Sequence, residues 1–470
     1  MPYSSSVNTK DVQALFRGFG LRWPHGRFFY CRYENGQAGR RLLQLLSPLT
    51  SYHDLSSAPP VCVNAAFTYA GLAALRLDND ILNSLPDDFR DGMLSRAKIN
   101  GDAGESDPSL WENIWHQQQV HLWVGAYARE QADLDSWAQK LLEFIESDDE
   151  ISSLGSQDVG RIVSDPETPV YIEDKSTQPK ESVLLEHFGF RDGVSNPPIS
   201  GLVEKQIKGA GRLDIDGKWH SYPPGEFLLG HIDTNGEIPI APKPEAFSHN
   251  GSFMVLRKLE QDVDLFRDYL TEQGSKLDAS ADDLAARMVG RKRDGTPLMP
   301  ANDIYDFRFS GDPEGRVCPM GSHIRRTNPR DSFGAQFGSL LVDRHRILRR
   351  AITYGRFVPS GKKQKEVNGS NGQGLMFIVL NASISRQFEF VQQQWVNYGN
   401  EFNQGNDTDP IIGTRQGNDQ MVIPGNDKEG RDTVICDELK QFVRCRGGDY
   451  FFLPGVAAFE GLADDGQGWR

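Results

Sequence analysis

The first third of the chain alternates strand-like and helix-like patterns of hydrophobic residues. The aromatic run 27–33, the apolar run 61–68 and the alternating run 119–126 predict strands. Apolar residues at helical spacing predict one helix that begins near residue 69 and another over 134–146. This order of elements suits an antiparallel sheet with helices on one face.

The second half of the chain repeats this rhythm. Apolar runs predict strands over 251–259, 374–382 and 450–453, and amphipathic patterns predict helices over 262–273 and 385–398. The sequence contains no exact short-period repeat, but the shared rhythm of its two halves permits two related α+β sheet domains.

Three polar or glycine-rich stretches predict connections between these elements. Residues 152–182 are polar and interrupted by Gly and Pro, so they predict a long connection. Residues 194–225 are rich in Pro and Gly and indicate a second irregular stretch. The polar, Gly-rich residues 362–374 predict a surface loop.

The chain is acidic overall. Its 51 Lys and Arg residues, against 65 Asp and Glu residues, give a formal net charge of −14 over 470 residues. Nucleic acids and anionic membranes both attract basic proteins, so we expect neither as a partner. The longest clean apolar run, 374–380, is far shorter than the roughly 18 residues that a membrane-spanning helix needs.

Two further features bear on the compartment. Residues 1–13 lack a basic segment followed by an apolar one, so we expect no signal peptide and a cytoplasmic location, or secretion if the sequence is a mature form. The five cysteines are scattered and contain no CxxC pair, which disfavours a zinc site and weakly favours a reducing compartment.

A glycine-flanked aspartate is the first candidate for chemistry. Gly189 and Gly193 stand on either side of Asp192 in an irregular segment. Glycines let a backbone approach a flat ligand closely, and the carboxylate would then point from the loop. A turn aspartate that caps its own backbone is the alternative interpretation.

A histidine among arginines is the second candidate. His323 is followed closely by Arg325, Arg326 and Arg330. Arginines suit ligand carboxylates, because the planar guanidinium binds them in a bidentate manner. Neighbouring cations disfavour protonation of the His, which leaves a neutral imidazole available to a metal. A solvent-exposed basic face with an incidental His is the alternative.

A third segment alternates arginine with apolar residues over 344–355. Some of these arginines must therefore face the interior. A buried arginine needs an anion or a polarised ligand as its partner, so this segment also favours an anionic ligand.

Together these segments resemble the dye-decolorizing peroxidases. The resemblance consists of GFRDG with Asp192, HIRRTNPR with His323 and ILRRAITYG with Arg349. The length is similar to that of the larger members of the family. The resemblance extends over nearly the whole chain, through VNTKDVQALFRGFG, VNAAFTYAGLAAL, PGEFLLGHID, NGSFMVLRKLEQDV, MVGRKRDGTPL, GLMFIVLNASI and FEFVQQQWVN.

The resemblance implies an α+β fold of two ferredoxin-like domains, each an antiparallel sheet with helices on one face. The N-terminal domain, 1–205, would carry the Asp192 loop, and the C-terminal domain, 206–470, would hold one haem b per chain. His323 would be the proximal iron ligand, with Asp409 behind it. The other implied haem contacts are Arg330 and Arg326 on the propionate side, and Leu375 and Phe377 in the distal pocket.

The implied activity is the reduction of hydrogen peroxide, coupled to one-electron oxidation of aromatic dyes or phenolic reductants. Asp192 would move a proton between the peroxide oxygens, because one group close to both oxygens can act as base and then as acid. Arg349 would favour the charged form of Asp192 and stabilise negative charge on the departing oxygen.

Several alternatives stay open at this point. Large dyes cannot reach a buried haem, and Tyr354 and Trp395 are the candidates for surface radical sites, although both could be packing residues. His323 and the arginines would equally serve a haem-handling protein, either a carrier or an iron-releasing deferrochelatase. A non-enzymatic structural module and a homo-oligomer are also open.

Overall fold

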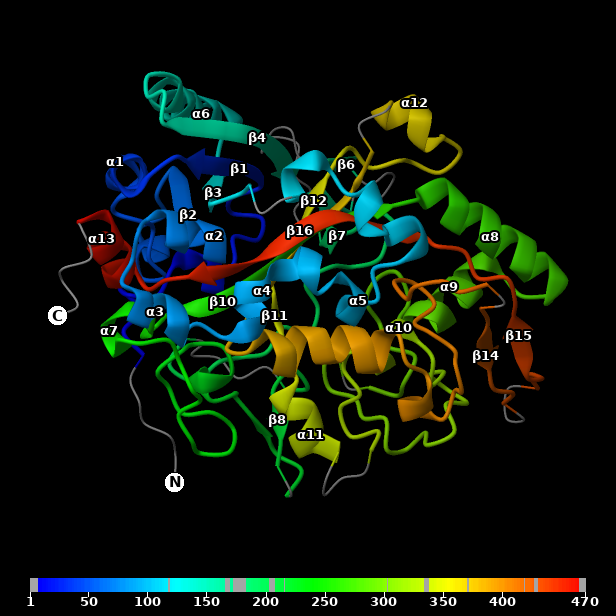
Figure 1. The fold of residues 1–470 in the computed structure, drawn as a ribbon. Helices are drawn as coiled ribbons and strands as arrows, with labels where there is room; N and C mark the ends of the chain where they lie inside the picture. Colours follow the sequence, from blue (N-terminus) through cyan, green and yellow to red (C-terminus); the bar gives the residue numbers. More distant parts are fainter. Residues whose placement is uncertain are drawn as a thin grey trace.

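Strands from both halves of the chain form one large antiparallel sheet, and helices cover it (Figure 1). Within the described residues, no helix is both long enough and apolar enough to cross a bilayer. The computed structural model describes residues 7–116, 119–164, 170–171, 183–202, 208–214, 216–301, 303–333, 338–369, 372–417, 419–426 and 430–464.

The first four long strands form a ferredoxin-like unit. Its elements are β1 His25–Tyr33, α1 Gly36–Leu46, β2 Val61–Phe67, β3 Leu122–Ala128, α6 Gln131–Glu146 and β4 Ile151–Gly160. The strands lie in the order β4, β1, β3, β2, and all neighbours are antiparallel. The predicted strands 27–33, 61–68 and 119–126 and the helices predicted from residue 69 and over 134–146 are confirmed as β1, β2, β3, α2 Tyr69–Ala74 and α6, whereas α1 and β4 were not predicted.

A second unit of the same kind follows. Its elements are β10 Ser252–Gln261, α8 Val263–Lys276, α9 Ala281–Val289, β11 Leu348–Arg349, β12 Ile352–Tyr354, β13 Gly374–Asn381, the π-helical segments η8 Ile384–Glu389 and η9 Val391–Val396, and β16 Val443–Leu453. β10 lies between β16 and β13, and β13 also pairs with β11 and β12. The α+β, ferredoxin-like fold class is thereby confirmed.

Two single residue pairs join the two units. Phe67 of β2 pairs with Phe452 of β16, and Gly160 of β4 pairs with Thr353 of β12. Because β10 also pairs with β13, the strand pairings close into a ring. The predicted domain boundary at 205/206 lies within 203–207, outside the described residues, and the division stays a prediction.

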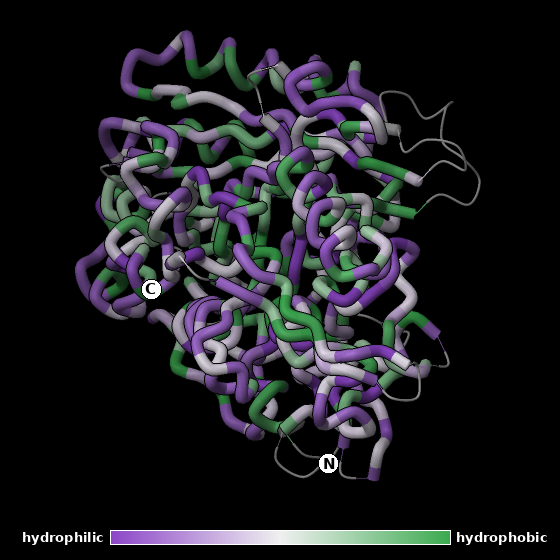
Figure 2. Tube along the Cα trace, turned by 90° about the vertical axis from the view of Figure 1, so that its right-hand side faces the viewer, coloured by the Kyte–Doolittle hydropathy of each residue, from purple (hydrophilic) through white to green (hydrophobic). Residues whose placement is uncertain are grey.

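The core fills the space between the sheet and its helices, and hydrophobic stretches of the chain gather in the interior (Figure 2). Every residue of β3 is buried. Trp123 of this strand packs edge-on against Phe28, with ring centroids 5.2 Å apart. Gly125 makes room for this indole, because a Cβ at that position would lie 2.4 Å from the Trp123 ring.

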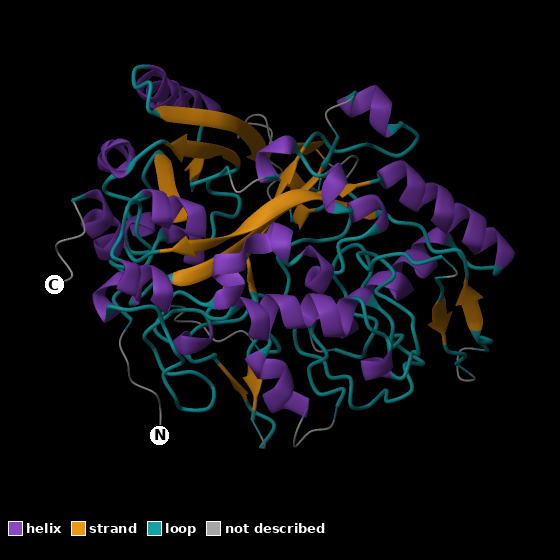
Figure 3. Cartoon of the chain, in the orientation of Figure 1, coloured by secondary structure: helices purple, strands orange, loops and turns teal. Residues whose placement is uncertain are grey.

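Loops and short elements make up much of the remaining chain (Figure 3). The short helices are α2 Tyr69–Ala74, α3 Asn79–Ser84, α4 Asp87–Ser95, α5 Ala97–Asn100, α7 Glu245–Ser248, α10 His323–Thr327, α11 Gly338–Arg344, α12 Gln364–Asn368 and α13 Val456–Ala463. The short strands are β5 Ile162–Val163, β6 Val170–Tyr171, β7 Leu184–Leu185, β8 Arg212–Leu213, β9 Trp219–His220, β14 Met421–Ile423 and β15 Val434–Cys436. All five cysteines are buried free thiols.

Two predictions about local structure are wrong, and a third is right about the helix but not about its type. Residues 152–160 belong to β4 and are not a connection; most of them are solvent-exposed, so the strand carries no hydrophobic pattern and is held by its pairing with β1. The predicted loop at 362–374 contains α12. The helix predicted over 385–398 is present, but as the π-helical segments η8 and η9, whose hydrogen bonds span five residues where those of an α-helix span four.

Candidate active site

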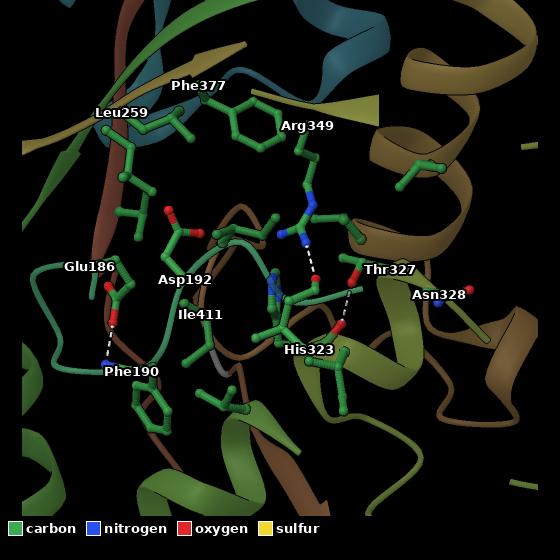
Figure 4. Close-up of a pocket in the computed structure, with 18 of the residues that line it drawn as sticks. Glu186, Phe190, Asp192, Leu259, His323, Thr327, Asn328, Arg349, Phe377 and Ile411 are labelled. Atoms are coloured by element: carbon green, nitrogen blue, oxygen red, sulfur yellow. Dashed lines mark hydrogen bonds between the residues drawn. The ribbon is translucent and has the colours of Figure 1, made fainter. Parts of the chain in front are cut away.

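A cavity lies where the strands of the second unit face the loop 186–195 and the helix α10 (Figure 4). Asp192 comes from the loop, Arg349 from β11 and His323 from the start of α10. Their side chains gather around one common space in Figure 4. The sequence-predicted residues from three distant segments of the chain are therefore brought together.

His323 is held by a buried carboxylate. Its Nδ1 lies 2.9 Å from Oδ2 of Asp409, whose side chain is fully buried. The other oxygen of Asp409 accepts the backbone N–H groups of Ile411 and Ile412 at 2.8 and 3.0 Å. These bonds fix the orientation of the imidazole, because Nδ1 is engaged and Nε2 is left to face the cavity.

The charge state of Asp409 follows from its contacts. Burial alone would raise the pKa of this carboxyl group, but the charge and hydrogen bond of His323, the backbone of Ile412 and the charge of Arg326 together lower it. Asp409 is therefore an anion next to the imidazole, which makes His323 a more basic ligand.

A partly buried carboxylate shapes the loop that carries Asp192. Glu186 accepts the backbone N–H groups of Phe188 and Phe190 at 2.9 and 2.8 Å, and the side-chain amide of Gln261 at 2.6 Å. Burial raises the pKa of Glu186, against these hydrogen bonds. Asp192 itself donates its backbone N–H to the carbonyl of Leu184 at 2.8 Å. Hydrogen bonds therefore hold this loop both at Glu186 and at Asp192.

Arg349 is partly buried and anchored to the same loop. Its Nη2 donates to the Val194 carbonyl at 2.7 Å, and its backbone N–H donates to the side chain of Asn196 at 3.2 Å. Burial lowers the pKa of Arg349, and the nearby Asp192 carboxylate opposes that shift. Asp192 and Arg349 therefore interact electrostatically across the cavity.

Three further arginines converge on Ser195. Arg291 and Arg330 donate to its hydroxyl at 3.2 and 3.4 Å, and Arg346 donates to its carbonyl at 2.9 Å. Burial and mutual repulsion lower the pKa of Arg330 to about 9, and burial with repulsion from Arg349 lowers that of Arg291 to about 10. All three arginines line the cavity, so this wall favours an anionic ligand.

The wall of the cavity formed by β13 is apolar, in contrast to the wall lined by arginines. Leu375 and Phe377 are two residues apart on this strand, so their side chains share the face that lines the cavity. Leu259 of the neighbouring β10 lies beside them in the cavity wall (Figure 4). The cavity therefore has an apolar wall and a cationic one.

Arg326 was predicted to lie on the propionate side of the haem, but the structure does not place it in the cavity wall. It is fully buried, and its guanidinium donates to the backbone carbonyls of Trp395 and Asp407 at 2.8 and 3.0 Å. It is not among the described residues that line the cavity. Its guanidinium acts on Asp409 instead, where it helps to keep that carboxylate charged.

The two predicted surface radical sites are not at the surface. Tyr354 is 2% exposed and Trp395 is 1% exposed, and neither is among the described lining residues. Tyr354 lies in β12, within the sheet, and Trp395 packs edge-on against His345 and Phe390. The packing alternative is the one that the structure favours for both.

Sequence reasoning missed Glu186 and the Ser195-binding arginines 291 and 346. Glu186 stands three residues before the GFRDG motif, and Arg291 stands inside MVGRKRDGTPL, which carried part of the family resemblance. Arg346 alternates with apolar residues, which is the signal for an inward-facing arginine.

Comparisons with known proteins agree with this geometry. The family description "Dyp-type peroxidase, C-terminal" matches residues 233–407. The chain is 28% identical to Peroxidase 2 of Mycetinis scorodonius, over 97% of this chain and 88% of the relative. Its fold superposes on the crystal structure of a fungal DyP-type peroxidase from Auricularia auricula-judae with a TM-score of 0.75 and 27% identity, over 98% of this chain and all of that one. A lower similarity, 26% over 57% of this chain and 41% of the relative, is found with a deferrochelatase of Yersinia pestis.

The fold, the cavity and these relatives together define the chain as a peroxidase built from two ferredoxin-like units. It is one of the dye-decolorizing peroxidases, as the motifs around Asp192, His323 and Arg349 indicated.

Members of this family are haem peroxidases, and the cavity residues fit a haem group. His323 offers a single imidazole, the Ser195-binding arginines offer cations for two carboxylates, and the β13 wall offers an apolar face for a flat ring. In the part of the chain that the structure describes, no cluster of three or more His, Cys, Asp or Glu residues could hold a metal ion by itself. An iron bound through His323 would thus need most of its ligands from a cofactor.

Proposed function

We propose that the chain binds one haem b and reduces hydrogen peroxide while it oxidises aromatic dyes or phenolic compounds in one-electron steps. The observation that carries the proposal is the convergence of Asp192, Arg349 and the Asp409-supported His323 on one cavity. The names of the relatives support peroxide and dyes as the substrates.

His323 would hold the iron through Nε2, because Nδ1 is engaged by Asp409. Bound haem supplies the redox-active iron at which the peroxide O–O bond is cleaved. Asp409 makes the imidazole more electron-rich, which favours cleavage of that bond over reversible oxygen binding. Arg330, with Arg291 and Arg346, would pair with the haem carboxylates, which relieves the mutual repulsion of these cations.

Asp192 would take the proton from the first oxygen of peroxide and return it to the departing oxygen. Arg349 would supply a fixed donor and a positive charge where negative charge develops. Both side chains project into the cavity from anchored backbone, so they need little rearrangement when peroxide enters. Leu375 and Phe377 would exclude water from this space.

An absorption spectrum of the purified protein before and after one equivalent of peroxide tests the proposal. We expect a Soret band that changes promptly with peroxide, and loss of that band in His323→Ala. Asp192→Asn should keep the band and lose the rapid change. No Soret band after addition of haem would contradict the proposal, and a band that peroxide leaves unchanged would contradict the roles of Asp192 and Arg349.

Haem handling is the second candidate function, because the chain is also similar to a deferrochelatase. That function would use His323 and the arginines without needing Asp192. Incubation with haem under reducing conditions distinguishes the two: release of an iron-free tetrapyrrole without peroxide-dependent dye bleaching would favour haem handling.

A further inference from the structure

Ser195 follows Asp192 by three residues and has a left-handed backbone. Its φ angle is +65°, and that of Gly193 is +74°. Serine disfavours this conformation because its Cβ crowds the backbone, so neighbouring contacts must hold Ser195 in it. Backbone strain of this kind gathers at functional sites. The chain therefore turns sharply between the aspartate of the cavity and the wall that favours anions.

The Ser195-binding arginines, Arg291, Arg330 and Arg346, are buried. Two of them donate to the Ser195 hydroxyl and the third donates to its carbonyl. Arg291 and Arg330 each also donate to two backbone carbonyls between residues 295 and 307. Among the described residues, the hydrogen-bond acceptors of these three arginines are carbonyl and hydroxyl oxygens, and none is a carboxylate. Hydrogen bonds thus fix these cations, and a bound carboxylate would supply their counter-charge.

Arg349 is held by the residues on either side of Ser195. Its Nη2 donates to the Val194 carbonyl at 2.7 Å, and its backbone N–H donates to the side chain of Asn196 at 3.2 Å. Asp192 begins the same turn, and its carboxylate interacts electrostatically with Arg349. The short segment 192–196 therefore contacts both the arginine wall and the Asp192–Arg349 pair.

The Ser195 hydroxyl has a donor to spare. A hydroxyl can accept two hydrogen bonds and donate one. Arg291 and Arg330 use both acceptor positions, and within the described residues the O–H has no acceptor. Ser195 lines the cavity together with these arginines. A carboxylate that binds the arginines would therefore also be within reach of the serine O–H.

We propose that Ser195 is a positioning residue that couples the two functions of the cavity. Binding of the cofactor's carboxylates to the Ser195-binding arginines is transmitted through Ser195 to Asp192 and Arg349, which act on peroxide. This inference rests on the proposed function, because the carboxylates are those of haem. Its new content is the coupling and the residue that carries it.

The coupling follows from the contacts. A carboxylate relieves the repulsion among the three arginines and fixes their guanidinium groups, because its hydrogen bonds with them are strong and directional. Ser195 is bound to the same guanidinium groups, so it is fixed with them. Val194 and Asn196 share peptide bonds with Ser195, so any shift of the serine also moves the two contacts that hold Arg349.

The test compares haem with its dimethyl ester, which carries no carboxylate. Apoprotein is titrated with each compound, and stopped-flow absorption gives the second-order rate constant for the change of the Soret band with peroxide. In the wild type we expect weaker binding of the ester. We also expect a rate constant for the ester-loaded protein that is roughly 5- to 150-fold lower, the usual range of coupling between two sites.

Ser195→Ala removes the hydroxyl and keeps the backbone carbonyl. We expect this variant to react slowly with peroxide, at nearly the same rate constant for haem and for the ester. Its preference for haem in the titration should persist, because the arginines remain. A serine that only stabilised the loop would lower both rate constants and leave their ratio as in the wild type, so the ratio separates the two roles.

Ser195→Gly is the second variant, because glycine also lacks the hydroxyl but accepts the left-handed backbone, and it replaces Ser195→Ala if that variant does not fold. Ala58→Gly is the matched control. Ala58 is left-handed as well, with a φ of +53°, and is not among the described residues that line the cavity. This control should keep the wild-type ratio of rate constants.

Arg330→Gln loaded with haem replaces the ester if the wild type does not retain the ester. It should slow the reaction with peroxide in the wild type and have little further effect in Ser195→Ala. Equal rate constants for haem and ester in the wild type, or a wild-type ratio in Ser195→Ala, would overturn the inference and leave the proposed function standing. Additive effects of Arg330→Gln and Ser195→Ala would do the same. A wild type that neither binds haem nor reacts with peroxide would overturn both.

Discussion

Asp409 and His323 form a hydrogen bond of 2.9 Å between residues 86 positions apart in the chain. The carboxylate is fully buried and the imidazole is partly exposed to the cavity. One end of the pair is therefore fixed by the protein interior, and the other end is presented to a ligand.

This relationship predicts the effect of Asp409→Asn. The amide can still hydrogen-bond but carries no charge, so we expect haem affinity to fall about 10- to 100-fold, the range typical of lost partners behind metal-binding histidines. Titration of the apoprotein with haem measures it. Asp407→Asn is the control, because the side chain of Asp407 is only partly buried and its carbonyl, not its carboxylate, binds Arg326. Equal affinities for the two variants would remove Asp409 from the site.

Asp192→Asn should retain haem and slow the oxidation of dye. The amide cannot take a proton, so we expect a decrease of roughly 10²- to 10⁴-fold in kcat/KM for peroxide. Steady-state dye bleaching at several peroxide concentrations measures this ratio. Asp216→Asn, an exposed aspartate, should leave the rate unchanged. Wild-type turnover in Asp192→Asn would show that another group moves the proton.

Glu186→Gln should disturb the loop that carries Asp192, although residue 186 has no direct role in the reaction with peroxide. The amide NH₂ would face a backbone N–H of Phe188 or Phe190, and a buried donor left without an acceptor costs about 1–3 kcal/mol. We expect lower thermal stability together with slower turnover, measured by thermal unfolding and dye bleaching. Glu237→Gln, at an exposed position, is the control. Unchanged values for both quantities would mean that the loop does not depend on Glu186.

Arg330→Leu should weaken the retention of haem. The guanidinium is buried near Arg291 and Arg346, where burial and repulsion lower its pKa to about 9, so a bound anion is the partner that its position favours. We expect faster transfer of haem to a competing apoprotein. Arg308→Leu is the control, because Arg308 is exposed and donates to the Gly217 carbonyl away from the cavity. Identical transfer rates would place the haem carboxylates elsewhere.

The raised pKa of Asp343 predicts that the free energy of unfolding depends on pH. Its pKa is raised from 3.8 to about 7 in the folded protein, so the folded state binds the proton more tightly than the unfolded chain does. The contribution of Asp343 to the free energy of unfolding is therefore greatest at low pH and declines as the pH rises from about 4 to about 7. Melting temperatures of wild type and Asp343→Asn over this range measure it. Their difference should shift in favour of the variant as the pH rises, and a constant difference would contradict the raised pKa.

The sequence predicted local features better than distant contacts. The strands β1, β3, β10 and β13 follow from alternation and apolar runs, because one or both faces of each strand are buried. β4 could not be predicted in this way, since pairing with β1 and not burial holds it.

The candidate site shows the same division. Asp192, His323 and Arg349 stand in distinctive motifs, so they could be singled out before their meeting in one cavity was known. The arginines that meet at Ser195 could not, because nothing local records that residues 291, 330 and 346 share a partner. The burial of Tyr354 and Trp395 likewise depends on neighbours far away in the chain.

The two junctions of the sheet bear on how the chain is made at the ribosome. β2 pairs with β16 through Phe67 and Phe452, so the partner of this strand is synthesised 385 residues later. Until then β2 is an open edge of a nearly complete N-terminal sheet, and open edges invite pairing with other chains. The ring of strands can close only when β16 has left the ribosome. We therefore expect nascent chains to be most prone to aggregate while the C-terminal half is being synthesised.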